Sequence, residues 1–187
     1  MILVDTNILF TFAKIDRLDL LEKVFGKMHI STNVLDEVKR AEELGYSHAK
    51  RISKWIEDDK ILISCVKENE VEFLDKIPYS FGRGERDSVA MALNRDALIV
   101  TNERKVLNFC RKKGIAHVRL NKILRKLSFR KEITIAHRYV KGGSFRNIVS
   151  NGVCDDHAGS KFALFSSLHY AYVVKSARDL RPSFISL

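Results

Sequence analysis

Five acidic side chains lie at the ends of predicted strands or in the helices that follow them, in a chain that is otherwise basic: Asp5, Glu37, Glu85, Asp87 and Glu103. When strands and helices alternate, ligands gather at the carboxyl ends of the strands, so these acids could converge on one pocket. Carboxylate oxygens are good ligands for hard divalent cations. Converging carboxylates in a basic protein therefore predict a nuclease that works with a divalent metal ion.

The composition is typical of a soluble globular protein. The 187 residues suit one domain, or one domain with an appendage, and 45% of them are hydrophobic while 30% are charged. The formal net charge is +10 at pH 7. Because a large positive charge favours association with polyanions, nucleic acid is the expected partner.

The cysteines and the apolar segments indicate a cytoplasmic protein. Cys65, Cys110 and Cys154 are an odd number, lie far apart and form no CxxC pair, which is typical of a reducing compartment. No stretch approaches the roughly 20 apolar residues that span a bilayer, and the apolar start of the chain has no basic segment before it. We expect no membrane segment.

Short apolar runs alternate with segments of helical periodicity along most of the chain. Strands are predicted at residues 2–4, 28–30, 61–63, 97–100 and 115–118. Helices are predicted after Asp5 as far as Phe10, at 19–25, from a cap at 31–33 to Gly45, and at 47–57, 71–77, 85–94 and 102–113. Strands joined by such helices form βαβ units, so we expect an α/β fold with a mostly parallel sheet.

The chain changes character after about residue 127. Residues 128–187 carry 9 of the 33 basic residues and 4 of the 23 acidic ones, and they are richer in Ser and Gly, as at Gly142, Gly143 and Ser144. Their apolar residues follow no sustained period. We therefore expect a domain at 1–127 and a basic, loosely ordered extension at 128–187, with one strand or helix near 162–174.

The segment Val4-Asp5-Thr6-Asn7 leaves two interpretations open. Asp5 follows a strand that should be buried, where an unpaired carboxylate is costly unless another group compensates it. Alternatively, Asp5 is the N-cap of the next helix. Each other acid could likewise complement a helix dipole. Four independent caps in this order and spacing are harder to explain than one shared site.

Four segments together resemble the PIN-domain ribonuclease family, which includes the virulence-associated protein C toxins of bacteria and archaea. The resemblance covers about residues 1–125. The hydrophobic-Asp-Thr-Asn opening of the family is similar to Val4-Asp5-Thr6-Asn7, and its second acid to Glu37. Its GE-x-[DE]-x-hydrophobic-A segment is similar to Gly84 through Ala90, and its Thr-Asn-Asp after the fourth strand to Thr101-Asn102-Glu103. The resemblance implies a Rossmann-like, three-layer α/β/α sandwich and an endoribonuclease that depends on Mg²⁺ or Mn²⁺.

The chemistry of the acids agrees with this implication. Two carboxylates about 4 Å apart repel each other by roughly 4 kcal/mol at an effective dielectric constant near 20, so the cluster needs a cation or protons. We expect Asp5 and Asp87 to be the principal metal ligands, with Glu37 and Glu103 binding directly or through water and Glu85 as a further partner. Supporting residues of the motifs are Thr6, Asn7, Thr101 and Asn102, of which the threonines could orient a carboxylate or a phosphate.

Basic residues near the predicted pocket could hold the phosphates that flank the cleaved bond: Arg83, Arg86, Arg104, Lys39 and Arg40. The alternative is that they form an ordinary solvated charged surface. Trp55 and Tyr79 could stack on bases, although a place in the core is the favoured interpretation for Trp55.

Several functions agree with this site. The leading one is a metal-dependent endoribonuclease that acts as a toxin, and the resemblance then implies an antitoxin protein that covers the acidic pocket and a homodimer. The same domain could mature RNA, with the basic extension binding ribosomal RNA. A catalytically inactive RNA-binding module and a nuclease acting on DNA remain open.

The segment Cys154-Asp155-Asp156-His157 is a weak zinc signal, because one Cys and one His lack a second pair, and a polar loop is the favoured interpretation. The sequence contains no P-loop and no GxGxxG segment. No nucleotide cofactor is expected.

Overall fold

The computed structural model describes residues 1–130, 132–138, 153–155, 161–167 and 170–176. The chain divides into two compact units, Met1–Ile123 and Leu124–Leu187. Each unit is described by itself below.

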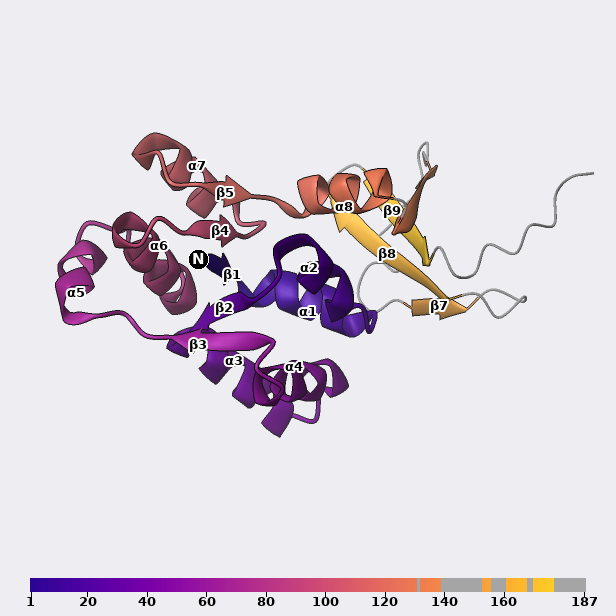
Figure 1. Cartoon of the computed structure of the whole chain (residues 1–187), viewed down its shortest axis with the longest axis horizontal. Coiled ribbons are helices and arrows are strands. Elements are labelled where there is room, and N and C mark those ends of the chain that lie inside the picture. The colour runs from indigo at the N-terminus through magenta and orange to yellow at the C-terminus, as the bar shows by residue number, and fades with distance from the viewer. Residues whose placement is uncertain (131, 139–152, 156–160, 168–169, 177–187) are drawn as a thin grey trace, which may run out of the picture. The chain divides into compact units, whose positions relative to one another are not determined.

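The first unit is built on five parallel strands, coloured from indigo to orange in Figure 1. They are β1 (Ile2–Val4), β2 (Met28–Ser31), β3 (Ile61–Ser64), β4 (Leu98–Val100) and β5 (His117–Val118). Their order in the sheet is β3-β2-β1-β4-β5, so β1 is the central strand. β2 and β3 are added on one side of β1, and the chain then crosses to the other side, where β4 and β5 lie. The parallel α/β sheet predicted from the sequence is confirmed.

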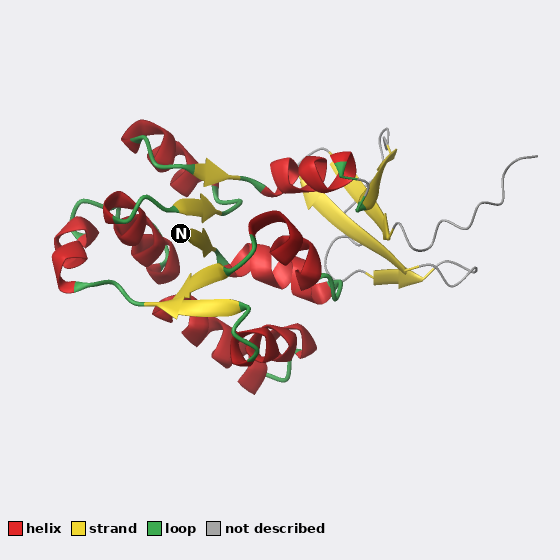
Figure 2. Cartoon of the chain, viewed as in Figure 1, coloured by secondary structure: helices red, strands yellow, loops and turns green. Residues whose placement is uncertain are grey.

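Helices follow the strands, and Figure 2 shows helices on either side of the sheet. In the first unit they are α1 (Thr6–Lys14), α2 (Leu18–Phe25), α3 (Thr32–Glu43), α4 (Ser47–Glu57), α5 (Glu68–Leu74), α6 (Arg83–Asn94) and α7 (Arg104–Lys113). A further helix, α8 (Leu120–Phe129), begins in the first unit and ends in the second. Within the described part of the chain, no helix is long and apolar enough to cross a membrane.

Both faces of the sheet are covered. Successive residues of the central strands point to opposite faces, and Leu3, Val4, Ile99 and Val100 are all buried. Leu3 and Ile99 belong to a core cluster with residues of α6 and α7, against which side chains of α5 pack. A parallel sheet that buries both faces reads as continuous apolar runs, which is why these short strands were recognisable in the sequence.

Three helices differ from the sequence prediction, and the first is α1, which continues to Lys14 and does not end at Phe10. The helix expected at 71–77 lies at Glu68–Leu74, because the Glu70 carboxylate accepts a hydrogen bond from the Lys67 backbone N–H and so starts the helix earlier. The helix α8 was not predicted, although Leu120, Ile123, Leu124 and Leu127 have helical spacing.

In the second unit, four strands form an antiparallel sheet in the order β6-β9-β8-β7. They are β6 (Ile133–Arg138), β7 (Val153–Asp155), β8 (Lys161–Ser167) and β9 (Tyr170–Ser176). The expectation of one strand or helix near 162–174 was wrong, since β8 and β9 both fall there and pair with each other. Gly142, Gly143 and Ser144, and also Asp156 and His157 of the weak zinc signal, lie outside the described residues.

Helices α3 and α6 approach each other closely at Gly84. A Cβ atom at this position would lie 2.8 Å from Cγ2 of Val34, a branched side chain that cannot swing away. Gly84 is therefore required for contact between the two helices that carry Glu37, Glu85 and Asp87.

We predict that Gly84→Ala lowers the free energy of unfolding by about 1–3 kcal/mol, because the added methyl group overpacks this contact. In a Val34→Ala background the same change should cost much less, or stabilise, since alanine favours a helix over glycine. Urea unfolding of the four proteins in this double-mutant cycle measures the coupling. Equal costs in both backgrounds would show that the contact with Val34 is not the constraint.

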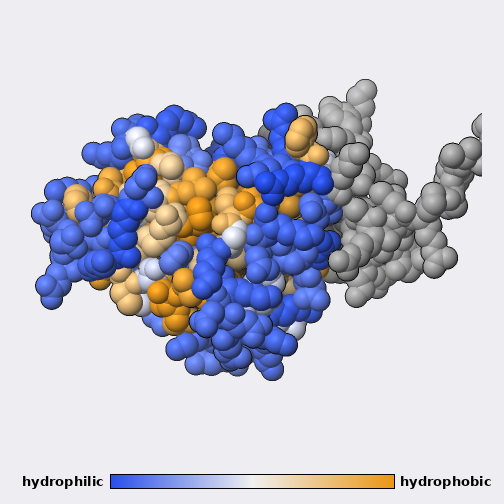
Figure 3. Space-filling view, viewed as in Figure 1, coloured by the Kyte–Doolittle hydropathy of each residue, from blue (hydrophilic) through white to orange (hydrophobic). Residues whose placement is uncertain are grey.

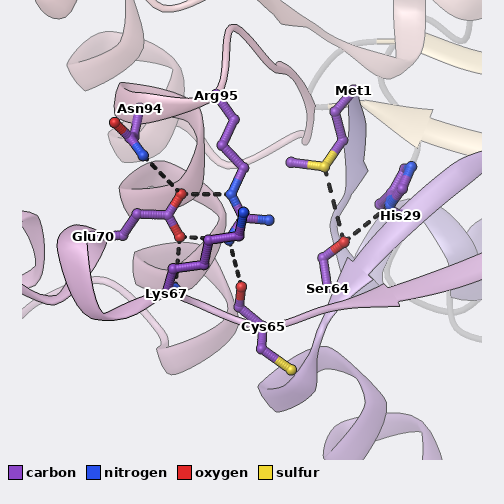
Figure 4. A network of polar contacts seen from close by, with 8 residues as sticks. All are labelled: Met1, His29, Ser64, Cys65, Lys67, Glu70, Asn94 and Arg95. Carbon is purple, nitrogen blue, oxygen red and sulfur yellow. Dashed lines mark hydrogen bonds and ion pairs between the residues drawn. The ribbon is translucent and has the colours of Figure 1, made fainter.

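A buried ion pair joins the start of α5 to the end of α6 (Figure 4). Glu70 is fully buried, and its carboxylate accepts hydrogen bonds from the Arg95 guanidinium at 2.5 Å and from Asn94 at 3.3 Å. Arg95 also donates to the backbone oxygen of Cys65. Hydrogen bonding by Arg95 lowers the pKa of Glu70 to about 2.

We predict that Glu70→Gln destabilises the protein at pH 7 by about 3–5 kcal/mol, because Arg95 is left without its counter-ion. The stabilisation by ionised Glu70 is complete above its unfolded pKa of 4.5 and is lost as the pH falls towards 2. The difference from the wild type should therefore shrink below pH 4.5. Chemical unfolding at several pH values, with the exposed Glu72→Gln as control, tests this expectation.

Candidate active site

The candidate site lies where β1 and β4 end side by side. The backbone N–H of Asp5 donates to the oxygen of Val100 at 3.0 Å, and the Thr101 hydroxyl donates to Oδ2 of Asp5 at 3.0 Å. Asp5 occupies the N-cap position of α1, but its side chain makes no capping hydrogen bond. Its carboxylate is therefore placed by the strand ends and is not used to cap the helix.

Glu37 is held at the same edge by the first residue of α1. The hydroxyl of Thr6, which is buried, donates to Oε2 of Glu37 at 2.5 Å. Glu37 itself is exposed on α3. The two threonines of the motifs are thus each hydrogen-bonded to an acid, Thr6 to Glu37 and Thr101 to Asp5.

Asp87 lies on the buried side of α6, with 7% of its surface exposed. Its Oδ2 accepts a hydrogen bond from the side-chain amide of Asn33 at 2.6 Å. From the sequence, Asn33 was recognisable only as a possible helix cap. The cap of α3 is Ser31, whose hydroxyl accepts from the Val34 N–H, and this leaves the Asn33 amide free to reach Asp87.

Glu85 and Glu103 lie at the starts of α6 and α7. The Gly82 N–H donates to Oε2 of Glu85 at 2.8 Å, so Glu85 helps to begin α6. Glu103 is the N-cap residue of α7, yet its side chain forms no capping hydrogen bond, and its backbone N–H donates to the Thr101 hydroxyl. Of the two, Glu85 has a structural role that uses one of its carboxylate oxygens.

Four of the five acids influence one another electrostatically. Burial raises the pKa of Asp5 to about 6, and the negative charges of Glu85 and Glu37 add to the rise, while the hydrogen bond from Thr101 opposes it. Burial also raises the pKa of Glu85, with contributions from Glu103 and Glu37. The strand ends therefore concentrate negative charge.

This negative charge is not neutralised by ion pairs in the part of the chain that the structure describes. There, none of the ion pairs formed by Lys or Arg involves the five acids. There too, no three His, Cys, Asp or Glu side chains are grouped so that they could hold a metal ion by themselves. Mg²⁺ commonly uses one or two carboxylates and completes its shell with water and substrate phosphate, so the oxygen donors around Asp5 fit such an ion.

The predicted RNA-binding residues differ in their surroundings. Arg83, Arg104, Lys39 and Arg40 are exposed. Arg86 is half-buried, and its Nη2 donates to the oxygen of Leu74 at 2.6 Å. Its buried Nε has no hydrogen-bond partner among the residues that the structure describes.

The two candidate stacking residues also differ. The Arg86 guanidinium lies 4.5 Å from the ring centre of Tyr79, which is 76% exposed. Trp55 is half-buried, with the Lys60 ammonium 4.6 Å from its ring centre.

We predict that Asp5→Asn stabilises the metal-free protein above pH 6. The pKa of Asp5 is raised in the folded state from 3.8 to about 6, so folding is most favourable below pH 3.8 and loses stability as the pH rises through 6. The full shift corresponds to as much as about 3 kcal/mol. Urea unfolding in chelator gives the free energy of unfolding of both proteins at each pH between 4 and 8. The two free energies should be equal near pH 4 and differ increasingly as the pH rises to 6. A difference that does not change with pH would contradict the assigned pKa of Asp5.

The chain was compared with curated proteins, solved structures and family models. No curated protein matches the chain. Among solved structures, a PilT N-terminus domain protein from the hyperthermophilic archaeon Sulfolobus solfataricus P2 is similar, with 15% sequence identity and a TM-score of 0.41, covering 67% of this chain and 91% of that one. The family model described as "DUF3368: PIN domain" matches residues 1–141. The chain therefore belongs to the DUF3368 family of PIN domains.

Proposed function

We propose that this protein is an endoribonuclease that hydrolyses phosphodiester bonds of RNA with the help of Mg²⁺ or Mn²⁺. The observation that carries the proposal is the state of Asp5. Asp5 is a half-buried carboxylate that directly follows the central strand and lies near other acids. Among the residues that the structure describes, it has no helix-capping hydrogen bond from its side chain and no ion pair. Membership of the PIN-domain family supports the same function.

The acids have distinct roles in this proposal. Asp5 and Asp87 are the principal ligands of the metal ion, and Glu37 and Glu103 bind it directly or through water. Glu85 is a weaker candidate, because it also holds the Gly82 N–H. Thr101, Thr6 and Asn33 keep the carboxylates of Asp5, Glu37 and Asp87 in place through hydrogen bonds.

A bound divalent ion would lower the pKa of its water and stabilise charge on the phosphate oxygens. The side chains of the protein would position the metal ligands and the substrate. The threonine and asparagine donors fix the carboxylates before substrate arrives, which reduces reorganisation during the reaction. Exposed Arg83, Arg104, Lys39 and Arg40 would hold phosphates on either side of the bond that is cleaved.

We further propose that the protein works as a homodimer and that an antitoxin protein covers the acidic pocket if it is a toxin. RNA maturation by the same site is the alternative biological role. A nuclease acting on DNA differs only in substrate. A catalytically inactive RNA-binding module is favoured by one observation, the use of Glu85 in starting α6, which leaves it fewer free oxygens for a metal ion.

We predict that the purified protein cleaves single-stranded RNA with Mg²⁺ or Mn²⁺ and not with chelator. Asp5→Asn and Asp87→Asn should each lower the rate by about a hundredfold or more, because a metal ion contributes several kcal/mol to stabilising the transition state. The matched control is Asp36→Asn, an exposed acid on α3 that should leave the rate unchanged. Gel analysis of end-labelled RNA gives the rates, and single-stranded DNA of the same sequence tests the substrate.

Metal binding should also be visible without catalysis. Since Mg²⁺ or Mn²⁺ competes with protons at Asp5, either ion should raise the melting temperature more at pH 7.5 than at pH 5. The effect should be lost in Asp5→Asn. RNA that stays intact in every metal, together with salt-sensitive RNA binding, would instead support the inactive RNA-binding module.

A further inference from the structure

The positive charge of the first unit is unevenly distributed about its sheet. From Arg104 to Ile123, which includes α7, β5 and the start of α8, there are seven Lys or Arg residues and no Asp or Glu. Residues 32–67 form α3, α4 and β3, the edge strand opposite β5, and contain seven basic and seven acidic residues. The β5 side of the sheet is thus positive, while the β3 side is neutral.

The end of β5 brings part of this charge to the edge of the sheet that holds the acids. The Thr101 N–H donates to the oxygen of Val118 at 3.2 Å, so the residue after β5 lies beside the end of β4. That residue is Arg119, which is exposed. Lys122, also exposed, follows in the first turn of α8, where its N–H donates to the Arg119 oxygen.

The start of α7 places a third cation next to the acids. Lys105 is exposed in the first turn of α7, two residues after Glu103, which is the N-cap residue of that helix. Figure 3 shows a mostly hydrophilic surface over α7.

The other cations of α7 have a simpler explanation. Arg111, Lys112 and Lys113 occupy its last turn, at the end far from the acids, where positive charge stabilises the helix dipole. Lys105, Arg119 and Lys122 have no such role, because each lies in or before a first helical turn, where the dipole disfavours positive charge.

We propose that Lys105, Arg119 and Lys122 form a phosphate-binding track that holds the backbone of an RNA strand on the β5 side of the acidic site. A phosphodiester at the acids is covalently joined to further phosphates of the same strand, and these need cations along its path. In the described part of the chain, the three residues form no ion pair. The choice of RNA rests on the proposed function, whereas the track requires only the phosphate backbone that RNA and DNA share.

Binding of fluorescein-labelled single-stranded RNA in chelator tests the track without cleavage. The variant Lys105→Gln/Arg119→Gln/Lys122→Gln is compared with Lys27→Gln/Lys50→Gln/Lys54→Gln, which removes the same charge at exposed positions elsewhere. The track variant should bind about tenfold to a hundredfold more weakly at 0.1 M salt, and its log–log salt slope should fall by about 2, since each contact with a single strand contributes about 0.7. The control variant should keep the wild-type slope.

Each outcome separates the track from the nuclease. Equal weakening in both triple variants, or no RNA binding by the wild type, overturns the track. Wild-type cleavage with unchanged binding by the track variant also overturns it and leaves the nuclease in place. Selective weakening without any cleavage by the wild type supports the track and removes the nuclease. Weakening that occurs only with single-stranded DNA overturns the assignment to RNA.

Arg119→Lys, which keeps the charge, should keep the wild-type salt slope, and a reduced slope would contradict a purely electrostatic contact.

Discussion

The contact between α3 and α6 at Gly84 is the constraint on which the arrangement of the acids depends. The two helices belong to separate βα segments of the chain, and a side chain at position 84 would meet Val34 at 2.8 Å. Their close approach places Asn33 within hydrogen-bond distance of Asp87. It also keeps Glu85 close enough to Glu37 for their charges to interact. The glycine in the motif therefore has a packing role, as the acids have a chemical one.

The acids around Asp5 are a compromise between two opposing demands. Burial and neighbouring negative charge favour the protonated form of Asp5, whereas metal binding requires the ionised form. A carboxylate that is positioned to bind a metal ion can lower the stability of the protein when the ion is absent. Glu70 is the opposite case: its pKa is lowered, because the Arg95 guanidinium pairs with its carboxylate inside the protein. The two sites show how the same fold treats compensated and uncompensated charge.

Much of the fold could be predicted because its strands are short, apolar and separated by clear helical patterns. The acids could also be found, since Asp5 and Glu103 follow strands directly and each stands in a short motif. Asn33 was missed because its partner is 54 positions away and no local pattern links it to Asp87. Arg119 and Lys122 were missed for a similar reason: their relation to the acids arises from the pairing of β4 with β5. The start of α5 was predicted too late, because the Glu70 carboxylate caps its own helix and hydrophobic periodicity does not reveal such a cap.

The Thr101 hydroxyl has a further consequence for the site. It accepts a hydrogen bond from the Glu103 N–H and donates its only proton to Asp5, so amide, hydroxyl and carboxylate form a chain with one direction. That chain starts at the amino-terminal end of α7, the positive end of a helix dipole. The polarity of α7 is thus transmitted through one hydroxyl to the carboxylate after the central strand, and α7 helps to keep Asp5 anionic.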